Sequence, residues 1–310
     1  MSKKLRIIFL GTPDFAAASL KKLVQNQVNV VAVITAPDKP QGRGKKLGMS
    51  AVKTYALEAG LPILQPANLK SPQFLEELKS YNADLQIVVA FRMLPVAVWD
   101  MPPMGTFNLH ASLLPQYRGA APINWAIING ETETGVTTFF LKHEIDTGEI
   151  IFQEPELIKP SDNVGNLYER LMNKGADLVL KTVLAIEVGD YPSQPQDNNQ
   201  EIKHAPKIFK EDCEIDWQKT SKEINDFIRG LSPYPAAWTK LHGKTLKVFE
   251  VEKANEGTNK SIGELYSDSK NYLRVNTKDG TLNIMDLQME GKRRMNVTDF
   301  LRGYQFQNQN

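Results

Sequence analysis

Two polar side chains that can stabilise an oxyanion stand where a short apolar run ends, at Asn108 and His110 in the stretch FNLH. Residues two apart on a strand point to the same side. An amide N–H and an imidazolium held together form an electropositive pocket for a carbonyl oxygen that becomes an oxyanion. A turn at Asn108 and a hydrogen-bonded interior histidine at His110 form the other interpretation, because short motifs allow both.

An acidic turn adds a third group to this pair. Asp146 begins an Asp-Thr-Gly turn between two strand-like runs, 134–142 and 149–157. Turn formation alone accounts for many such tripeptides, but a carboxylate there can also reach the imidazole of His110 and favour its charged form. We therefore predict an acyl-transfer site. An amine attacks directly, Asn108 and His110 stabilise the tetrahedral oxyanion, and Asp146 assists the departure of the proton.

Competing chemistries lack the spacing they need. Ser112 follows His110 by two residues, but no G-x-S-x-G nucleophile elbow is present. The four histidines show no H-E-x-x-H or comparable spacing, so we expect no metal site. The first glycine turn, residues 11–15, has one glycine followed by a proline, so a nicotinamide cofactor is not indicated.

Alternating patterns of strands and helices surround these residues. Strands are predicted over 5–10, 28–35, 84–90 and 105–109. Helices are predicted near 13–25, 49–59, 71–80, 120–129 and 163–187. This alternation is typical of an α/β fold with a Rossmann-like parallel sheet covered on both faces. Because such sheets bind ligands beyond the carboxyl ends of their strands, Asn108 and His110 stand at a binding edge.

The composition changes after residue 188. Residues 189–206 are rich in Pro, Gln and Asn and have no periodicity, which indicates a linker. After it we predict a helix at 219–230 and short strands over 245–251, 260–266, 271–275 and 281–287. Their spacing favours a small β-barrel. The predicted organisation is a domain over 1–188, a linker over 189–206 and a second domain over 207–310.

The charge balance limits how nucleic acid can bind. The net charge of the 310 residues is +1, so contacts with phosphates must come from local patches. The loop 36–49 carries Arg43, Lys45 and Lys46 among glycines and prolines. It is either a solvated surface loop or a basic finger that contacts phosphates and becomes ordered on binding. A second cluster, 292–294, is expected to be solvated surface.

The remaining composition is that of a soluble enzyme. Hydrophobic residues make up 41% and charged residues 24%. No run approaches the roughly 20 apolar residues of a membrane helix, and the apolar start is predicted to be the first strand rather than a signal peptide. A single cysteine, Cys213, excludes an internal disulfide. A cytoplasmic location is expected. Trp217, Tyr234 and Trp238 are expected in the core of the second domain rather than stacked on bases.

Several stretches together resemble the folate-dependent formyltransferase family. They are FLGTPDFA, DKPQGRGKKL, NLHASLLPQYRGAAPINWAI, GVTTFFLKHEIDTGEII and EIDWQKTSKEINDFIRGLSPYPAAW. The third and fourth are specific together, because they supply Asn108, His110 and Asp146 in the order that the family uses. The resemblance implies these three as the catalytic set. It also implies 10-formyltetrahydrofolate as the formyl donor, no metal, and a second domain that is a barrel of the oligonucleotide-binding type and assists tRNA binding.

The same resemblance implies roles for two loops. Ser112, Leu113, Leu114 and Pro115 match the folate-binding loop of the family. Arg43, Lys45 and Lys46 fall on the inserted loop that the family uses at the acceptor end of tRNA. The implied acceptor is the α-amino group of initiator methionyl-tRNA, and a monomer is expected. Arg92 departs from the pattern, because the family usually has glycine there, in the wall of the pterin pocket.

Three alternatives remain open at this point. A formyltransferase for a small-molecule amine, such as glycinamide ribonucleotide, would share the catalytic set but would not need both the basic loop and the barrel. A hydrolase would release formate without an amine. A non-catalytic RNA-binding protein on a Rossmann-like scaffold would have no use for linked Asn, His and Asp side chains.

Overall fold

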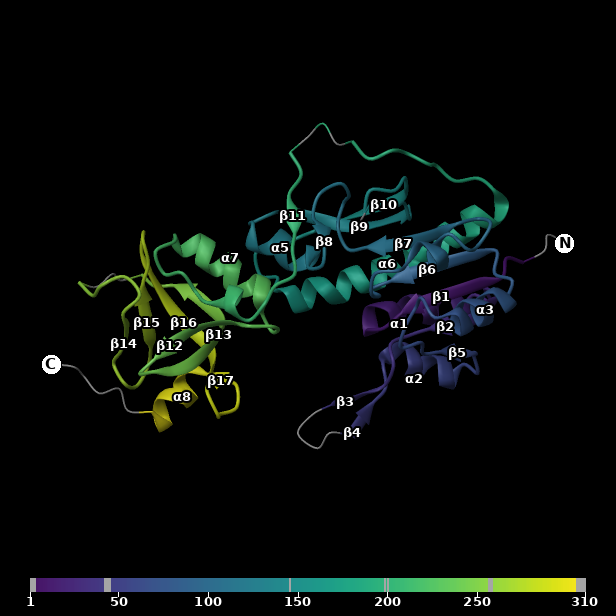
Figure 1. The fold of residues 1–310 in the computed structure, drawn as a ribbon. Helices are drawn as coiled ribbons and strands as arrows, with labels where there is room; N and C mark the ends of the chain where they lie inside the picture. Colours follow the sequence, from purple (N-terminus) through teal and green to yellow (C-terminus); the bar gives the residue numbers. More distant parts are fainter. Residues whose placement is uncertain are drawn as a thin grey trace. The chain divides into compact units, whose positions relative to one another are not determined.

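The chain forms two compact units, each built around its own main sheet (Figure 1). A computed structural model describes residues 4–41, 46–144, 146–197, 199, 201–255 and 259–304. The first unit combines residues 1–119, 134–156 and 169–204, and the second combines 120–133, 157–168 and 205–310. None of the helices in this described part has the length and apolar content that crossing a membrane requires.

The sheet of the first unit has the order β10-β9-β7-β6-β1-β2-β5. Its strands are β1 (Ile7–Gly11), β2 (Val30–Ile34), β5 (Ile63–Leu64), β6 (Leu85–Val89), β7 (Thr106–His110), β9 (Glu133–Phe140) and β10 (Ile150–Leu157). Strands β5, β2, β1, β6 and β7 pair in parallel, whereas β9 runs antiparallel to β7. The predicted Rossmann-like parallel sheet is confirmed.

Helices alternate with these strands, and two of them begin at a serine cap. They are α1 (Asp14–Gln25), α2 (Ala51–Glu58), α3 (Pro72–Ser80), α4 (Val96–Trp99) and the long α6 (Val164–Val188). The side chains of Ser50 and Ser71 accept hydrogen bonds from the third backbone N–H of α2 and α3, which satisfies donors that a helix start leaves unpaired. Five helices predicted from periodicity, near 13–25, 49–59, 71–80, 120–129 and 163–187, are therefore present with small shifts at their ends.

Strand β7 carries the predicted site into the middle of this sheet. It lies between β6 and β9, with Asn108 opposite Val88 on one side and Phe139 on the other. Leu109 packs against Gly175 of α6, where a Cβ atom would meet the leucine side chain. Because side chains alternate along a strand, Asn108 and His110 point to the face opposite α6. The strand on which this prediction rests is present as β7.

Two short hairpin strands and two short segments complete the first part of the chain. Strands β3 (Lys39–Gln41) and β4 (Lys46–Gly48) pair antiparallel after β2. Strand β8 (Arg118–Gly119) follows β7. Strand β11 (His204–Ala205) spans the boundary at which the first unit ends, at His204, and the second resumes, at Ala205.

The second unit is a curled antiparallel sheet with helices against it (Figure 1). Its strands are β12 (Ala237–Leu241), β13 (Lys244–Lys253), β14 (Leu265–Ser267), β15 (Leu273–Asn276), β16 (Thr281–Met289) and β17 (Met295–Asn296). Its helices are α5 (Pro122–Ile128), the short 3-10 helix η1 (Glu211–Cys213), α7 (Ser221–Leu231) and α8 (Val297–Gly303). Residues from α7 and from β13 and β16 share one buried apolar core, among them Ile224, Ile228, Leu246 and Leu287.

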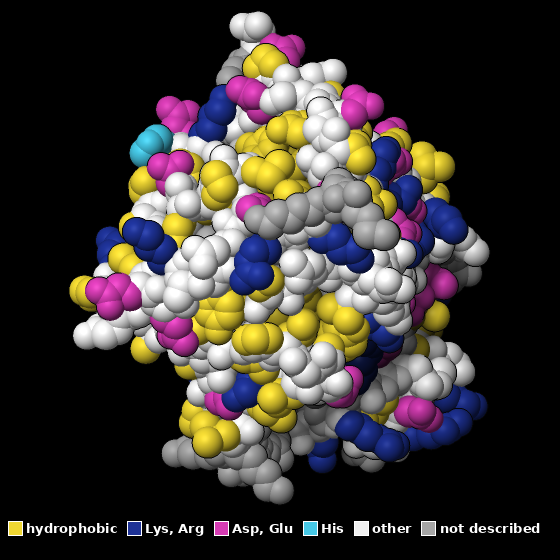
Figure 2. All heavy atoms as spheres, turned by 90° about the vertical axis from the view of Figure 1, so that its right-hand side faces the viewer, with side chains coloured by type: hydrophobic (Ala, Val, Ile, Leu, Met, Phe, Trp, Pro, Cys, Tyr) yellow, Lys and Arg dark blue, Asp and Glu magenta, His cyan; other side chains and the backbone are white. Residues whose placement is uncertain are grey.

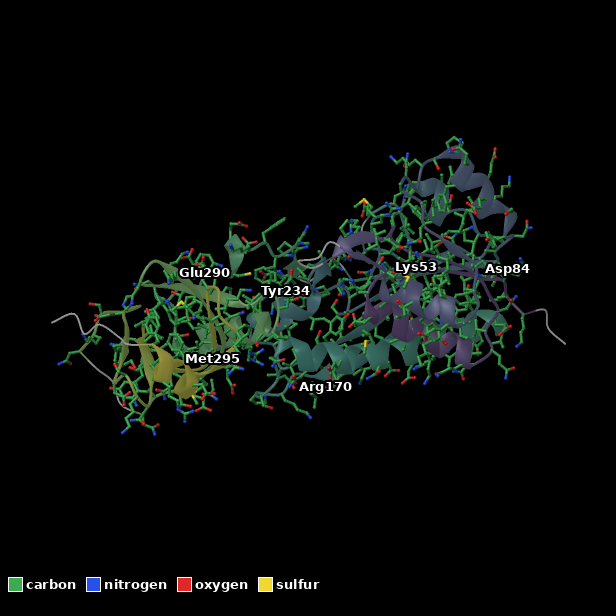
Figure 3. All side chains as sticks on the ribbon, turned by 90° about the horizontal axis from the view of Figure 1, so that it is seen from below. Lys53, Asp84, Arg170, Tyr234, Glu290 and Met295 are labelled. Atoms are coloured by element: carbon green, nitrogen blue, oxygen red, sulfur yellow. The ribbon has the colours of Figure 1, made fainter. Side chains whose placement is uncertain are left out.

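Some details of the second unit differ from the sequence prediction. Strand β12 and helix α8 were not predicted, and the strand expected over 260–266 is confined to Leu265–Ser267. Trp217 is buried in the core as expected, but Tyr234 is 81% exposed, so its predicted core position is wrong (Figure 3). The physical reason is local, because Tyr234 stands between two prolines, and prolines favour a surface turn.

The central strand offers a direct test of this core. Phe107, on β7, is fully buried. Replacing it with alanine leaves a cavity among the sheet and helices, so Phe107→Ala should lower the free energy of unfolding by about 3–5 kcal/mol. Chemical denaturation of the full-length protein measures this free energy of unfolding. Val188→Ala at the exposed end of α6 is the control and should stay within about 0.5 kcal/mol of the parent. Equal stabilities for the two variants would contradict this account of the core.

Candidate active site

Asn108 presents a half-buried amide at the carboxyl end of β7. Its backbone is fixed on both sides by the sheet, since β6 and β9 flank the strand. Within the described residues, its side-chain amide makes no hydrogen bond with another protein group. A half-buried amide without a protein partner is available to a ligand, because polar groups away from bulk water are normally hydrogen-bonded. Asn108 can therefore donate to an oxygen that enters from this edge of the sheet.

His110 is held by a backbone carbonyl. Its side chain is 8% exposed, and Nε2 lies 2.9 Å from the carbonyl oxygen of Tyr117. A carbonyl oxygen only accepts, so Nε2 must carry the proton in this bond. The other ring nitrogen, Nδ1, is then the one that can gain or lose a proton. Tyr117 itself is buried with a left-handed φ of 59°, which fixes the direction of its carbonyl.

Asp146 is held by the backbone N–H of Gly119, two residues after Tyr117. Its Oδ2 atom accepts a hydrogen bond of 3.1 Å from the N–H of Gly119. Asp146 has a φ of 56°, a left-handed conformation that aspartate adopts more readily than most residues. Gly148 closes the same turn, and a Cβ atom there would collide with the carbonyl oxygen of Phe140. The backbone conformation of this turn therefore explains Gly148 and suits aspartate at position 146.

One short segment thus anchors two of the predicted catalytic side chains. Tyr117 holds His110 and Gly119 holds Asp146. The described residues show no hydrogen bond or ion pair between His110 and Asp146 themselves, so their direct contact stays a prediction. Burial lowers the pKa of Arg118, between the two anchors, while the carboxylates of Asp146 and Glu144 oppose that shift. A cation between the anchors adds to the positive potential at this edge.

The loop predicted to bind folate is fixed to the neighbouring strands. Ser112 donates to the carbonyl of Gln116 at 2.6 Å. Thr137 on β9 donates to the carbonyl of Ser112 at 2.6 Å and accepts from the N–H of Leu114. Gln153 on β10 donates to the carbonyl of Leu114 at 2.9 Å. Two side chains that sequence analysis did not single out, Thr137 and Gln153, therefore preorganise this loop.

The other two residues of this loop are also placed by packing. Leu113 lies against Gly135 of β9, where a Cβ atom would overlap the leucine side chain. Pro115 is buried. Hydrogen bonds and packing therefore hold the backbone of 112–115 in one conformation. Its binding of folate stays a prediction.

Arg92 turns toward the backbone of a different loop. Its guanidinium donates to the carbonyl oxygens of Pro66 and Ala67, the second at 3.1 Å, and lies over the ring of Phe91. The unusual cation therefore joins the loop after β6 to the loop after β5. Its charge is engaged by these carbonyl groups.

The predicted tRNA loop corresponds to the hairpin of β3 and β4. Arg43 and Lys45 lie outside the described residues, and only the backbone of Lys46 is described, paired with Gln41. At the base of the hairpin, Thr35 and Ser50 share a hydrogen bond of 2.7 Å between their hydroxyl groups. The two ends of the hairpin are therefore tied together.

Asp38 adds a charged anchor at the same base. Its carboxylate accepts hydrogen bonds from Lys53 at 2.5 Å and from Gln65 at 2.9 Å (Figure 3 labels Lys53). These bonds hold the pKa of Asp38 below its usual value. The hairpin therefore starts from a fixed position on the first unit.

Charges of both signs are interspersed on the surface that Figure 2 shows, as the net charge of +1 predicts. Of the second basic cluster, Lys292 and Arg293 are exposed, which agrees with the predicted solvated surface. Arg294 is exposed as well, and it pairs with Asp286 at 2.7 Å and lies over the ring of Phe249. Over the ranges that the structure describes, no group of three or more His, Cys, Asp or Glu side chains could hold a metal ion.

Comparison with known proteins places this architecture. The family model described as formyl transferase matches residues 5–183, and the model of the formyl transferase C-terminal domain matches residues 207–305. The chain therefore belongs to the formyl transferase family. It is accordingly an enzyme of the transferase class that uses formyl-tetrahydrofolate.

Curated relatives named methionyl-tRNA formyltransferase match nearly the whole chain. A methionyl-tRNA formyltransferase from Parabacteroides distasonis is 57% identical over 97% of this chain and 96% of its own length. The methionyl-tRNA formyltransferase of Phocaeicola vulgatus is 59% identical over 99% of this chain and 98% of its own. That of Flavobacterium johnsoniae is 53% identical over 98% of both. The predicted family resemblance is confirmed.

Solved structures share the fold at low identity. WlaRD, a sugar 3N-formyl transferase, superposes with a TM-score of 0.66 at 23% identity over 94% of this chain and 100% of its own. HypX from Aquifex aeolicus, in complex with tetrahydrofolic acid, gives a TM-score of 0.63 at 21% identity over 96% of this chain and 47% of its own. These likenesses concern the fold alone.

The Asp146 turn provides a test of the site geometry. Gly148→Ala should displace this turn, because the new methyl group would collide with the carbonyl of Phe140. A misplacement of about 1 Å can cost about 100-fold in turnover, so formyl transfer should fall by at least about 10-fold. Gly303→Ala is the matched control, since nothing lies within 4 Å of its new Cβ atom. Unchanged turnover in Gly148→Ala would show that the position of this turn does not matter to the reaction.

Proposed function

We propose that this protein transfers the formyl group of 10-formyltetrahydrofolate to the α-amino group of initiator methionyl-tRNA, with Asn108, His110 and Asp146 as the catalytic set. One observation supports the assignment of residues most directly. The imidazole and the carboxylate are fixed by the same three-residue segment, next to an amide that has no protein partner in the described structure. The relatives described above, which are named methionyl-tRNA formyltransferases, support the acceptor.

The first step forms a tetrahedral intermediate. The unprotonated amine attacks the formyl carbon, and the formyl oxygen becomes an oxyanion. The amide of Asn108 donates to this oxygen. His110 keeps Nε2 on the carbonyl of Tyr117, so a charged ring donates to the oxyanion from Nδ1.

The second step breaks the bond between the formyl carbon and N10 of the folate. The amine must lose a proton and N10 must gain one when it leaves. Asp146 moves this proton, through water, from the amine nitrogen toward N10. The products are formylated methionyl-tRNA and tetrahydrofolate, and no external oxidant or metal takes part in this balance.

Two loops hold the substrates in this proposal. Ser112, Leu113, Leu114 and Pro115 bind the folate through their fixed backbone. Arg43, Lys45 and Lys46 contact phosphates at the acceptor end of the tRNA, from the hairpin anchored by Asp38. Long basic side chains on a loop are suited to phosphate contacts, which position nucleic acid without reading its sequence.

The domain roles follow from the same proposal. Residues 1–188 catalyse, 189–206 connect, and 207–310 assist tRNA binding through a barrel of the oligonucleotide-binding type. The enzyme acts in the cytoplasm. It acts as a monomer, because one chain supplies the whole catalytic set. Light scattering coupled to size-exclusion chromatography measures the oligomeric state, and an assay with glycinamide ribonucleotide as the rival acceptor tests the substrate. Formylation of that small amine in preference to methionyl-tRNA would contradict the proposal.

Asn108→Ala tests the oxyanion role. Loss of one oxyanion donor typically costs about 10²–10³ in turnover. The expected result is a kcat reduced by about that factor, with the affinity for methionyl-tRNA almost unchanged, measured by formyl transfer and by filter binding. Asn166→Ala, on the exposed start of α6, is the control and should keep full turnover. Full turnover in Asn108→Ala would remove Asn108 from the catalytic set.

Arg43→Ala tests the basic loop. Removing one phosphate contact should weaken tRNA binding and reduce the slope of its salt dependence by about one. Folate affinity should stay unchanged, which equilibrium titration with folate measures. Lys21→Ala, an exposed cation on α1, is the matched control. A loss confined to folate affinity would contradict the assignment of Arg43.

A further inference from the structure

Gln196 connects the loop that carries Asp146 to the segment that holds His110. We infer that it is a positioning residue for the proposed reaction, acting through Asp146. The inference rests on the proposed role of Asp146 as a proton carrier. The sequence analysis placed residue 196 in the linker and gave it no role.

The side chain of Gln196 uses both ends of its amide. The NH₂ group donates to the carbonyl oxygens of Asp146 at 2.8 Å and Gly148 at 2.9 Å. The carbonyl oxygen accepts from Nε of Arg118 at 3.1 Å and from Nη2 at 2.5 Å. Gln196 is 8% exposed, so these partners replace water almost completely.

These contacts join the two sides of the site. The donor end fixes the carbonyl groups on either side of Thr147, within the turn that points the carboxylate of Asp146. The acceptor end holds Arg118, which lies between the anchor of His110 and the anchor of Asp146. One buried amide therefore sets the distance between the acidic turn and the segment 117–119.

The chain around Gln196 makes further hydrogen bonds to the same two loops. The backbone of Gln194 exchanges two hydrogen bonds with Ile150 at the start of β10. Ser193 donates to the carboxylate of Glu149, just after the acidic turn. Further along, the carbonyl of Lys203 accepts from the N–H of Tyr117 at 2.6 Å. Four residues of this segment thus contact the two catalytic loops, although the segment has no periodicity: Ser193, Gln194, Gln196 and Lys203.

The donor end of the amide makes a specific demand on residue type. Glutamate at this position would keep an acceptor for Arg118 but would place an oxygen against the carbonyl groups of Asp146 and Gly148. Repulsion would then move the acidic turn although size and burial are nearly unchanged. Glutamate and alanine at position 196 should therefore both reduce turnover. If Gln196 served only to hold Arg118, glutamate would preserve turnover.

Steady-state formyl transfer on the full-length enzyme tests this inference. Gln196→Ala and Gln196→Glu should lower kcat by about 10- to 100-fold, since small displacements of a catalytic group have effects of this size. The KM values for 10-formyltetrahydrofolate and methionyl-tRNA should change by less than about threefold, because the substrates bind elsewhere. Gln73→Glu, at an exposed glutamine on α3 outside this network, is the matched control and should keep full turnover.

A double-mutant cycle with Asp146→Asn separates positioning from a general loss of structure. Asparagine tolerates the left-handed backbone of Asp146, so this variant removes the charge and preserves the turn. Adding Gln196→Glu to Asp146→Asn should lower kcat by less than about twofold, because the group being positioned is already inactive. A full additional loss in the double variant would overturn the inference.

The two proposals fail in different ways. Full turnover in Asp146→Asn would contradict the catalytic role of Asp146 itself. A large loss in Asp146→Asn together with full turnover in Gln196→Glu would overturn only the role of Gln196. Thermal melting of each variant checks that the fold is retained, and the Gln196→Glu variant carries the test if Gln196→Ala does not fold.

Discussion

Two backbone groups, the carbonyl of Tyr117 and the N–H of Gly119, fix the imidazole of His110 and the carboxylate of Asp146. The rest of the site depends on this constraint, because a general acid–base pair works only at hydrogen-bond range. The parallel sheet supplies the third group by placing Asn108 on the same side of β7 as His110. The proposed chemistry therefore depends on the segment 117–119, which holds both groups through its backbone.

The candidate catalytic residues could be proposed from the sequence because the chemistry of their side chains and their secondary structure are both local. Asn108 and His110 stand two apart at the end of an apolar run, so their common side follows from strand geometry. Asp146 was identified from its turn, and Gly148 shows that the turn sequence also satisfies a steric requirement. The distance between the turn and the strand was beyond sequence reasoning, because it depends on which loops meet in three dimensions.

The side chains that hold the predicted folate loop and the Asp146 turn were missed for the same reason. Thr137, Gln153 and Gln196 are single polar side chains without a motif, and each acts on a loop far away in the sequence. The composition of 189–206 predicted a linker, but composition carries no information on hydrogen-bond partners, and the structure groups residues 189–204 with the first unit. The prediction for Tyr234 was wrong for another reason. Its aromatic character favoured a core position, but the flanking prolines place it at the surface.

The most direct measurement is a crystal structure of this enzyme with a formyl-folate analogue that cannot transfer its formyl group. The account predicts the formyl oxygen within about 2.7–3.1 Å of Nδ2 of Asn108 and of a ring nitrogen of His110. It also predicts the carboxylate of Asp146 beside the imidazole, with Gln196 still bonded to the acidic turn. A formyl group bound away from both donors, or an Asp146 carboxylate remote from His110 in that complex, would contradict it.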